Sequence, residues 1–177
     1  MKFLQEANCY WITGLSGSGK STLSSSLAEI IRKQNKNLVL LDGDKLRLIF
    51  NSQSFNNADR LNLSYQYAKT SKMLLDQGIN VIISVMALFH EVQVWNRNNI
   101  RNYVEVFLDV PIHELERRDP KGLYQMYKKG QIKNMVGLDI KAEFPKNPDF
   151  HFKWEKSQNL ENIANVLFDD FKSRNAI

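Results

Sequence analysis

Glycines, a lysine and hydroxyl groups are concentrated in one stretch near the start of the sequence. Gly14–Ser21 reads GLSGSGKS and matches the pattern G-x-x-x-x-G-K-[ST]. Glycines let the backbone curl until several N–H groups point inward, and the N-terminus of a following helix adds a positive dipole. In such a loop Lys20 reaches the β- and γ-phosphates of a nucleotide, and the Ser21 hydroxyl can ligate Mg²⁺. The stretch predicts a binding loop for a phosphate donor, formed by Gly14, Leu15, Ser16, Gly17, Ser18, Gly19, Lys20, Ser21 and Thr22.

Two carboxylates, Asp42 and Asp44, follow the next apolar run with one glycine between them. Because the run at Leu38–Asp42 has the composition of a strand, both side chains are expected at the carboxyl edge of a sheet, where open α/β folds bind ligands. One carboxylate could order Mg²⁺ and its waters, and the other could accept a proton from a hydroxyl group. The pattern also allows a simple turn in which Asp44 caps a helix, and capping does not exclude catalysis.

Stretches of strand type alternate with stretches of helix type along the chain. The expected strands are rich in Val, Ile and aromatic residues and lie at Cys9–Thr13, Leu38–Asp42, 81–85 and 103–110. Helices are expected at about 19–33, 59–76 and 89–101. A last helix has Leu160, Ile163, Ala164, Leu167 and Phe171 at helical spacing. This order predicts an α/β fold with a doubly wound parallel sheet flanked by helices.

Residues 117–150 do not fit this alternation. The segment is basic, contains three glycines and three prolines, and has no sustained hydrophobic period. A long irregular segment inside a compact domain is usually functional or disordered. Nothing in the composition suggests a linker, so residues 1–177 are expected to form one domain. Four arginines, Arg47, Arg60, Arg117 and Arg118, are candidate clamps for substrate phosphates.

The overall composition favours small anionic partners. The formal net charge is +5 and the pI is about 9.3, which a basic solvated surface would also explain. Cys9 is the single cysteine, so no disulfide can form within the chain and a cytoplasmic location is expected. Because Cys9 precedes an apolar run, it is expected to be a buried strand residue. The longest apolar stretch, 79–89, is too short to span a bilayer. Aromatic and basic residues are not interleaved in the manner of nucleic-acid-binding surfaces, so neither membrane nor nucleic acid is an expected partner.

Taken together, these motifs resemble the adenylyl-sulfate kinase family over nearly the whole chain. The supporting motifs include LDGDKLR at 41–47 and FPKNPD at 144–149, and the most specific is RDPKGLY at 118–124 followed by GQIKNMVGLD at 130–139. The resemblance implies a P-loop kinase that transfers the γ-phosphoryl of MgATP to the ribose 3′-hydroxyl of adenylyl sulfate. It also implies that residues 117–150 form a mobile lid, and relatives of this kind often form homodimers.

The resemblance also implies roles for individual residues. Lys20, Asp42 and Asp44 would be catalytic, with Ser21 and Asp42 toward the metal and Asp44 near the 3′-hydroxyl. Arg118 and the loop around Pro145 would lie over the adenine of ATP. The implied contacts with the acceptor nucleotide are Asp44, Arg47, Phe55, Arg60, Lys133, Met135 and Leu138.

Several acceptor positions depart from the family pattern. Leu63, Tyr65 and Gln66 stand where the family has an asparagine and arginines. Ala87 replaces a serine that has been described as a phosphorylated intermediate, so direct transfer is expected here. The family stacks the acceptor base between two phenylalanines, and only Phe55 is retained because Met135 occupies the second position.

One aromatic ring opposite a flexible thioether suits a base that differs from adenine or is smaller. The expected acceptor is therefore cytidine diphosphoramidate, the substrate of a similar enzyme in bacteria that decorate their capsules with phosphoramidate. Adenylyl sulfate itself, with neutral drift at these positions, is an alternative. A second alternative is a regulatory protein that uses the nucleotide-binding loop as a switch.

Overall fold

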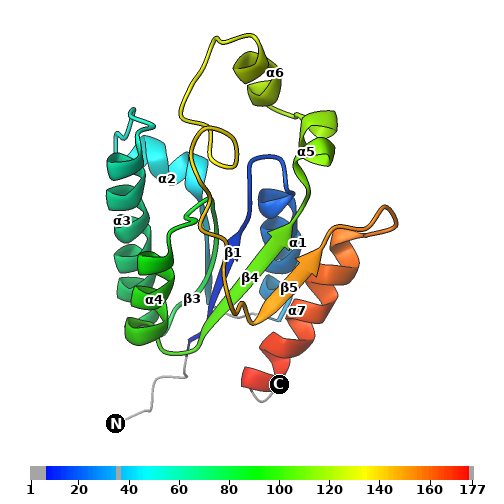
Figure 1. Cartoon of the computed structure of the whole chain (residues 1–177). Helices are drawn as coiled ribbons and strands as arrows, with labels where there is room; N and C mark the ends of the chain where they lie inside the picture. Colours follow the sequence, from blue (N-terminus) through cyan, green and yellow to red (C-terminus); the bar gives the residue numbers. More distant parts are fainter. Residues whose placement is uncertain (1–6, 35–36, 176–177) are drawn as a thin grey trace.

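The computed structural model describes residues 7–34 and 37–175 and, within them, one parallel sheet in the order β2-β3-β1-β4-β5 (Figure 1). β1 lies at the centre and pairs with β3 on one side and β4 on the other. The strands are β1 (Cys9–Thr13), β2 (Leu38–Asp42), β3 (Asn80–Val85), β4 (Tyr103–Asp109) and β5 (Phe150–Lys153).

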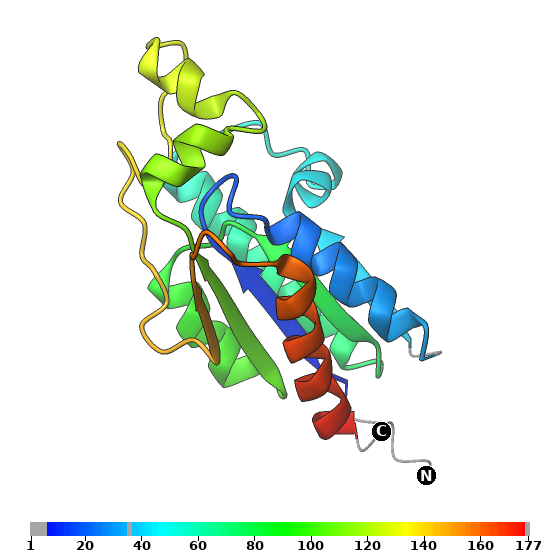
Figure 2. The same cartoon turned by 90° about the vertical axis from the view of Figure 1, so that its right-hand side faces the viewer.

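Helices cover both faces of the sheet, which confirms the prediction of a doubly wound α/β fold. α1 (Lys20–Arg32) and α7 (Leu160–Asn175) pack together on one face. α3 (Asn57–Leu75) and α4 (His90–Asn99) lie on the other (Figure 2).

Alternate side chains of β1 explain how the sheet serves two cores. Tyr10 and Ile12 belong to a buried cluster with apolar residues of α1 and α7. Cys9 and Trp11 belong to a second cluster with residues of α3 and α4, which confirms that Cys9 is buried. Burial raises the pKa of the Cys9 thiol well above its ordinary value, so the group is an uncharged core side chain.

Four expected strands and four expected helices are present, with ends displaced by a few residues. The fifth strand, β5, was not expected, because its four residues are alternately half-buried and exposed. Three short helices add to the pattern: α2 (Gly43–Ile49), α5 (Ile112–Arg118) and α6 (Leu123–Lys128). α5 follows Pro111, its N-cap residue, and α6 lies inside the segment taken as irregular.

Residues 117–150, here called the lid segment, run above the carboxyl edge of the sheet before they return to β5 (Figures 1 and 2). The segment rests on a small core that includes Leu15, Leu115, Tyr124 and Met135. Leu15 belongs to the glycine-rich loop, so that loop and the lid segment share one apolar cluster. Among the described residues, no helix combines the length and apolar character needed to cross a membrane.

Candidate active site

The glycine-rich loop connects the end of β1 to the start of α1, as the sequence predicts. Gly19 precedes the helix in a left-handed conformation with φ of 97°, which an L side chain rarely adopts. A Cβ atom on Gly14 would lie 2.7 Å from the carbonyl oxygen of Leu108 on β4. The loop therefore needs glycine for two reasons, close backbone approach at one end and left-handed backbone at the other.

Lys20 begins α1, and its Nζ donates a hydrogen bond to the carbonyl oxygen of Leu15 at 2.8 Å. The ammonium group thus lies across the loop that holds it. Burial lowers its pKa to about 8, and the positive charge of Lys121 acts in the same direction, whereas Asp44 and Asp42 oppose the shift. At neutral pH Lys20 is still mostly protonated and can attract a phosphate group.

Asp42 is the most constrained carboxylate in this region. Its Oδ2 accepts hydrogen bonds from the hydroxyl groups of Ser21, at 2.8 Å, and Ser84, at 3.1 Å. Its Oδ1 accepts from the backbone N–H groups of Asp44 and Lys45, so Asp42 is the N-cap of α2. Partial burial opposes ionisation, but these four donors outweigh it and lower the pKa of Asp42. The expectation that Asp44 caps a helix is wrong, because Asp44 lies inside the first turn.

The pair Ser21 and Asp42 has the chemistry of a magnesium site. A hydroxyl and a carboxylate oxygen meet at 2.8 Å beside the phosphate-binding loop, and Mg²⁺ prefers a few hard oxygen ligands completed by waters and substrate phosphates. Among the described residues, no group of three or more His, Cys, Asp and Glu side chains could hold a metal by itself. The donor set therefore fits an ion that arrives with a nucleotide.

Asp44 differs from Asp42 in exposure and in partner. Its side chain is 70% exposed and forms an ion pair with Lys121, the fourth residue of RDPKGLY in the lid segment. Two further hydrogen bonds join the lid segment to walls of this region. The hydroxyl of Tyr124 donates to the carbonyl oxygen of Ser16 at 3.0 Å, and Arg60 donates to the carbonyl oxygen of Asn134 at 3.0 Å.

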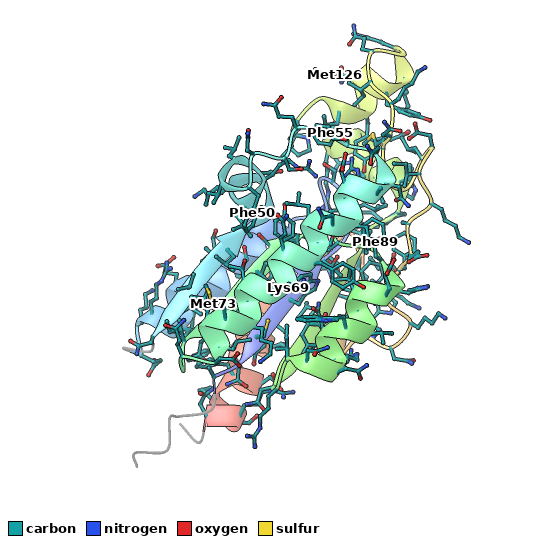
Figure 3. The ribbon with its side chains drawn as sticks, turned by 90° about the vertical axis from the view of Figure 1, so that its left-hand side faces the viewer. Phe50, Phe55, Lys69, Met73, Phe89 and Met126 are labelled. Atoms are coloured by element: carbon teal, nitrogen blue, oxygen red, sulfur yellow. The ribbon has the colours of Figure 1, made fainter. Side chains whose placement is uncertain are left out.

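Two arginines hold the exposed ring of Phe55. The guanidinium carbons of Arg47 and Arg60 lie 4.4 Å and 5.2 Å from the ring centroid. Arg47 also donates to the carbonyl oxygen of Ser54 at 2.8 Å, and Arg60 to that of Phe55 at 2.7 Å. Figure 3 places Phe55 near the N-terminal end of α3, on the side of Met126 and the lid segment. Burial, together with the neighbouring charge of Arg47, lowers the pKa of Arg60.

A cavity of about 480 Å³ connects these parts. Its walls come from the glycine-rich loop, the start of α2, one side of α3 and the lid segment. Most predicted site residues line it: Ser16, Gly17, Gly19, Lys20, Ser21, Thr22, Asp42, Asp44, Arg47, Phe55, Arg60, Lys133 and Met135.

The remaining predicted site residues lie outside this lining. Gly14, Leu15 and Ser18 form the body of the loop, with Leu15 and Ser18 buried. Pro145 is also buried, and Leu138 packs against the apolar core of the lid segment.

Arg117 and Arg118 both donate to Glu114 of the same helix. These hydrogen bonds lower the pKa of Glu114 to about 2. The structure thus places Arg117 and Arg118 in an ion cluster on α5, so their roles toward a nucleotide stay predictions.

The cavity also contains residues that received no predicted role. Lys121 lies within a motif that the sequence singles out, so its position could have drawn attention to it. The sequence pattern places Tyr67 on the apolar face of a helix and Ser84 in a strand. Only the fold brings them beside residues 42–44, here called the DGD turn. Of the departures from the family, Leu63 lines the cavity and is buried, whereas the Tyr65 hydroxyl donates to Glu91 at 3.1 Å.

The fold and the cavity define the class of P-loop phosphotransferases. A glycine-rich phosphate-binding loop and two carboxylates line one cavity at the carboxyl edge of a parallel sheet. The family described as adenylylsulphate kinase matches residues 6–153. The chain belongs to this family, whose members are phosphotransferases acting on a hydroxyl group.

Two relatives of known name are equally similar to the chain. The cytidine diphosphoramidate kinase of Campylobacter jejuni is 40% identical over 135 residues, which cover 76% of this chain and 79% of the relative. The adenylyl-sulfate kinase of Pseudomonas aeruginosa is 40% identical over 142 residues, which cover 78% and 72%. Overall identity therefore does not distinguish between the two acceptors.

A solved structure supports the fold over nearly the full length. The APS kinase of Mycobacterium tuberculosis in complex with AMPPNP and APS matches with a TM-score of 0.87 and 30% identity. The match covers 94% of this chain and 98% of that one.

Proposed function

We propose that this chain transfers the γ-phosphoryl group of MgATP to the ribose 3′-hydroxyl of cytidine diphosphoramidate. The observation that carries the proposal is the single cavity that joins the phosphate-binding loop, the DGD turn and the pair Phe55 and Met135. Direct group transfer requires a donor site and an acceptor site within one cavity.

On the donor side, the protein supplies position and positive charge. Lys20 and the N–H groups of the glycine-rich loop would hold the β- and γ-phosphates. Ser21 with Asp42 would hold Mg²⁺ once their mutual hydrogen bond opens to admit the ion. The metal ion, when bound with ATP, neutralises charge on the phosphate oxygens. Thr22 and Ser16, which line the same wall, would complete the contacts with ATP, and we propose the same for Arg118 and Pro145 from the family pattern.

On the acceptor side, Asp44 would orient the 3′-hydroxyl and accept its proton. Its carboxylate is exposed to the cavity, whereas Asp42 is saturated with four hydrogen-bond donors. Asp42 has therefore little capacity left to act as a base, and the division of roles between the two carboxylates follows from their partners. Lys121 would have to release Asp44 when substrate binds.

The base of the acceptor would lie against Phe55. The two guanidinium groups beside this ring hold it in place and also offer positive charge to the phosphates of the acceptor. Met135, from the lid segment, is 7% exposed and lies within the same cavity. The flexible thioether of Met135 covers less of a base than a second aromatic ring would, which favours a pyrimidine over a purine.

This proposal is tested by incubating the protein with MgATP and cytidine diphosphoramidate and measuring ADP release. Phosphorus NMR of the product should show a new phosphate monoester on the ribose 3′-oxygen. Acceptor-independent release of inorganic phosphate, with no phosphorylated nucleotide, would contradict the proposal and favour a nucleotide-hydrolysing switch.

Adenylyl sulfate is the second candidate acceptor. It is favoured by the retained Phe55 and by the likeness to a structure that contains APS. The proposal places the protein in the cytoplasm, with capsule modification as the pathway for a cytidine acceptor and sulfate assimilation for an adenine acceptor. By analogy with the family, we propose a single kinase domain over residues 1–177, a mobile lid and a homodimer.

A further inference from the structure

The DGD turn is held by a residue from outside its own motif. The hydroxyl of Tyr67, on α3, donates to the carbonyl oxygen of Gly43 at 3.1 Å. Gly43 lies between the two carboxylates and has little free space, since a Cβ atom there would lie 3.1 Å from the carbonyl oxygen of Ser84.

The two hydrogen-bonding groups of one peptide unit are therefore fixed from opposite sides. The carbonyl oxygen of Gly43 accepts from Tyr67, and the N–H group of Asp44, in the same peptide unit, donates to Asp42 at 3.0 Å. Because a peptide unit is planar, holding its oxygen and its N–H group fixes the plane and the direction in which the Asp44 side chain leaves the backbone.

Asp44 needs this backbone support because few side-chain contacts hold its carboxylate in place. The carboxylate is 70% exposed, and it forms an ion pair with Lys121 from the lid segment. Substrate binding would require Lys121 to move. Without that ion pair, the aim of the carboxylate depends on its backbone and hence on the Gly43–Asp44 peptide unit.

Tyr67 is suited to this task by its own surroundings. It is buried, belongs to the core cluster on this face of the sheet, and its ring centroid lies 6.1 Å from that of Phe50. Burial raises its pKa to about 12, with smaller effects of opposite sign from Arg47 and Asp44. The hydroxyl therefore keeps its proton and remains a donor throughout the neutral range.

We infer that Tyr67 is a positioning residue for phosphoryl transfer, which acts through the Gly43–Asp44 peptide unit to aim the carboxylate of Asp44 at the acceptor hydroxyl. The inference rests on the proposed function, because it needs Asp44 to face the reacting hydroxyl. It adds a residue of α3 to a site that the motifs of the glycine-rich loop and the DGD turn would otherwise define alone.

The test is a double-mutant cycle on turnover. Tyr67→Phe keeps the ring and removes the hydroxyl, and we expect kcat to fall roughly three- to ten-fold with the KM for MgATP unchanged, the scale of one lost neutral hydrogen bond. In an Asp44→Asn background the same change should reduce kcat by less than about two-fold, because there is no base left to aim. A merely structural role of the hydroxyl would give the same loss in both backgrounds.

Tyr10→Phe is the matched control, since its hydroxyl donates to Asp170 on the other face of the sheet and neither residue lines the cavity. It should leave kcat unchanged. A Tyr67→Phe variant with wild-type kcat, or an additive cycle, would overturn the inference while Asp44→Asn still lowers turnover. Unchanged turnover in Asp44→Asn would instead contradict the proposed role of Asp44 itself, and the inference with it.

Discussion

At the scale of the residue, the site depends on a buried ammonium group whose charge is sensitive to pH. Lys20→Ala removes the side chain that is proposed to hold the transferred phosphate. We expect turnover to fall by a factor on the order of 10²–10³, the scale for one preorganised electrostatic group. Steady-state assays of ADP release would measure it. Lys33→Ala is the control and should keep full activity, because Lys33 lies at the C-terminal end of α1, is exposed and is paired with Glu29.

The lowered pKa of Lys20 predicts how ATP binding responds to pH. The charged form binds phosphate, and the pKa in the free protein is about 8. Affinity for MgATP should therefore be nearly constant around neutrality and weaken as pH rises through about 8. Titration calorimetry with a non-hydrolysable ATP analogue would show the inflection. Its persistence in a Lys20→Met variant would contradict the assignment to Lys20.

The base preference can be assigned to one residue of the lid segment. Met135→Phe restores a second ring opposite Phe55, and we expect the preference for adenine over cytidine acceptors to rise about two- to ten-fold, the worth of one aromatic pair. The measurement is kcat/KM for both acceptors. Met126→Phe is the control, because Met126 lies in the same segment outside the cavity lining. An unaltered preference in Met135→Phe would remove the argument for a pyrimidine.

Residue types and spacing predicted the donor side of the site better than the acceptor side. Lys20, Ser21 and Asp42 lie in or next to short motifs, so their proximity follows from local geometry and parallel strand order. Tyr67 approaches Gly43 across 24 positions and Ser84 approaches Asp42 across 42. Such contacts depend on how α3 and β3 pack, which periodicity does not specify.

At the scale of the element, strong hydrophobic patterns predicted well and weak ones did not. The apolar runs of β1, β3 and β4 are buried and that of β2 is half-buried, and all four were recognised. β5 is a four-residue edge strand with alternating exposure, and α6 has six residues, too short for a helical period to show. Asp42 rather than Asp44 caps α2 because its backbone is extended, with φ of −107° and ψ of 130°, as an N-cap requires.

The lid segment is coupled to the glycine-rich loop by direct packing. A Cβ atom on Gly137 would lie 2.9 Å from two carbons of Leu15, and φ of Gly137 is +91°. Gly137→Ala should therefore lower the melting temperature and raise the KM for MgATP, because overpacking costs about 1–3 kcal/mol and disturbs the loop. Thermal unfolding and steady-state kinetics would measure both effects.

Gly130→Ala is the matched control for that prediction. Gly130 also has a left-handed backbone, with φ of +68°, but nothing lies within 4 Å of a Cβ atom placed there. We expect a smaller loss of stability and an unchanged KM for MgATP. Equal effects of the two variants would show that backbone strain alone, and not contact with Leu15, explains the result.

At the scale of the whole molecule, positive charge is concentrated in the lid segment. The lid segment has eight Lys and Arg residues and four Asp and Glu residues, so it carries four of the five net charges of the chain. Both substrates are anionic, and such a field speeds association. The kcat/KM for the acceptor should fall by a factor of several as salt rises from low to moderate concentration, because screening shortens the range of attraction.

Two pairs of charge-reversal variants distinguish the effect of charge in the lid segment from that of the net charge of the chain. Lys129→Glu with Lys141→Glu alters exposed residues of the lid segment, whereas Lys69→Glu with Lys156→Glu alters exposed residues elsewhere. Figure 3 shows Lys69 on α3, away from Met126 and the lid segment. The first pair should lower kcat/KM and its salt dependence more than the second. Equal effects would point to net charge alone.

The measurement that tests the account most directly is a competition between the two acceptors. The protein is given MgATP with equal concentrations of cytidine diphosphoramidate and adenylyl sulfate, and phosphorus NMR and mass spectrometry follow both 3′-phosphorylated products. The ratio of initial rates then equals the ratio of kcat/KM values. We predict that the cytidine product forms at least about ten times faster, a difference that one changed pocket contact can supply. Faster formation of 3′-phosphoadenylyl sulfate would contradict the account.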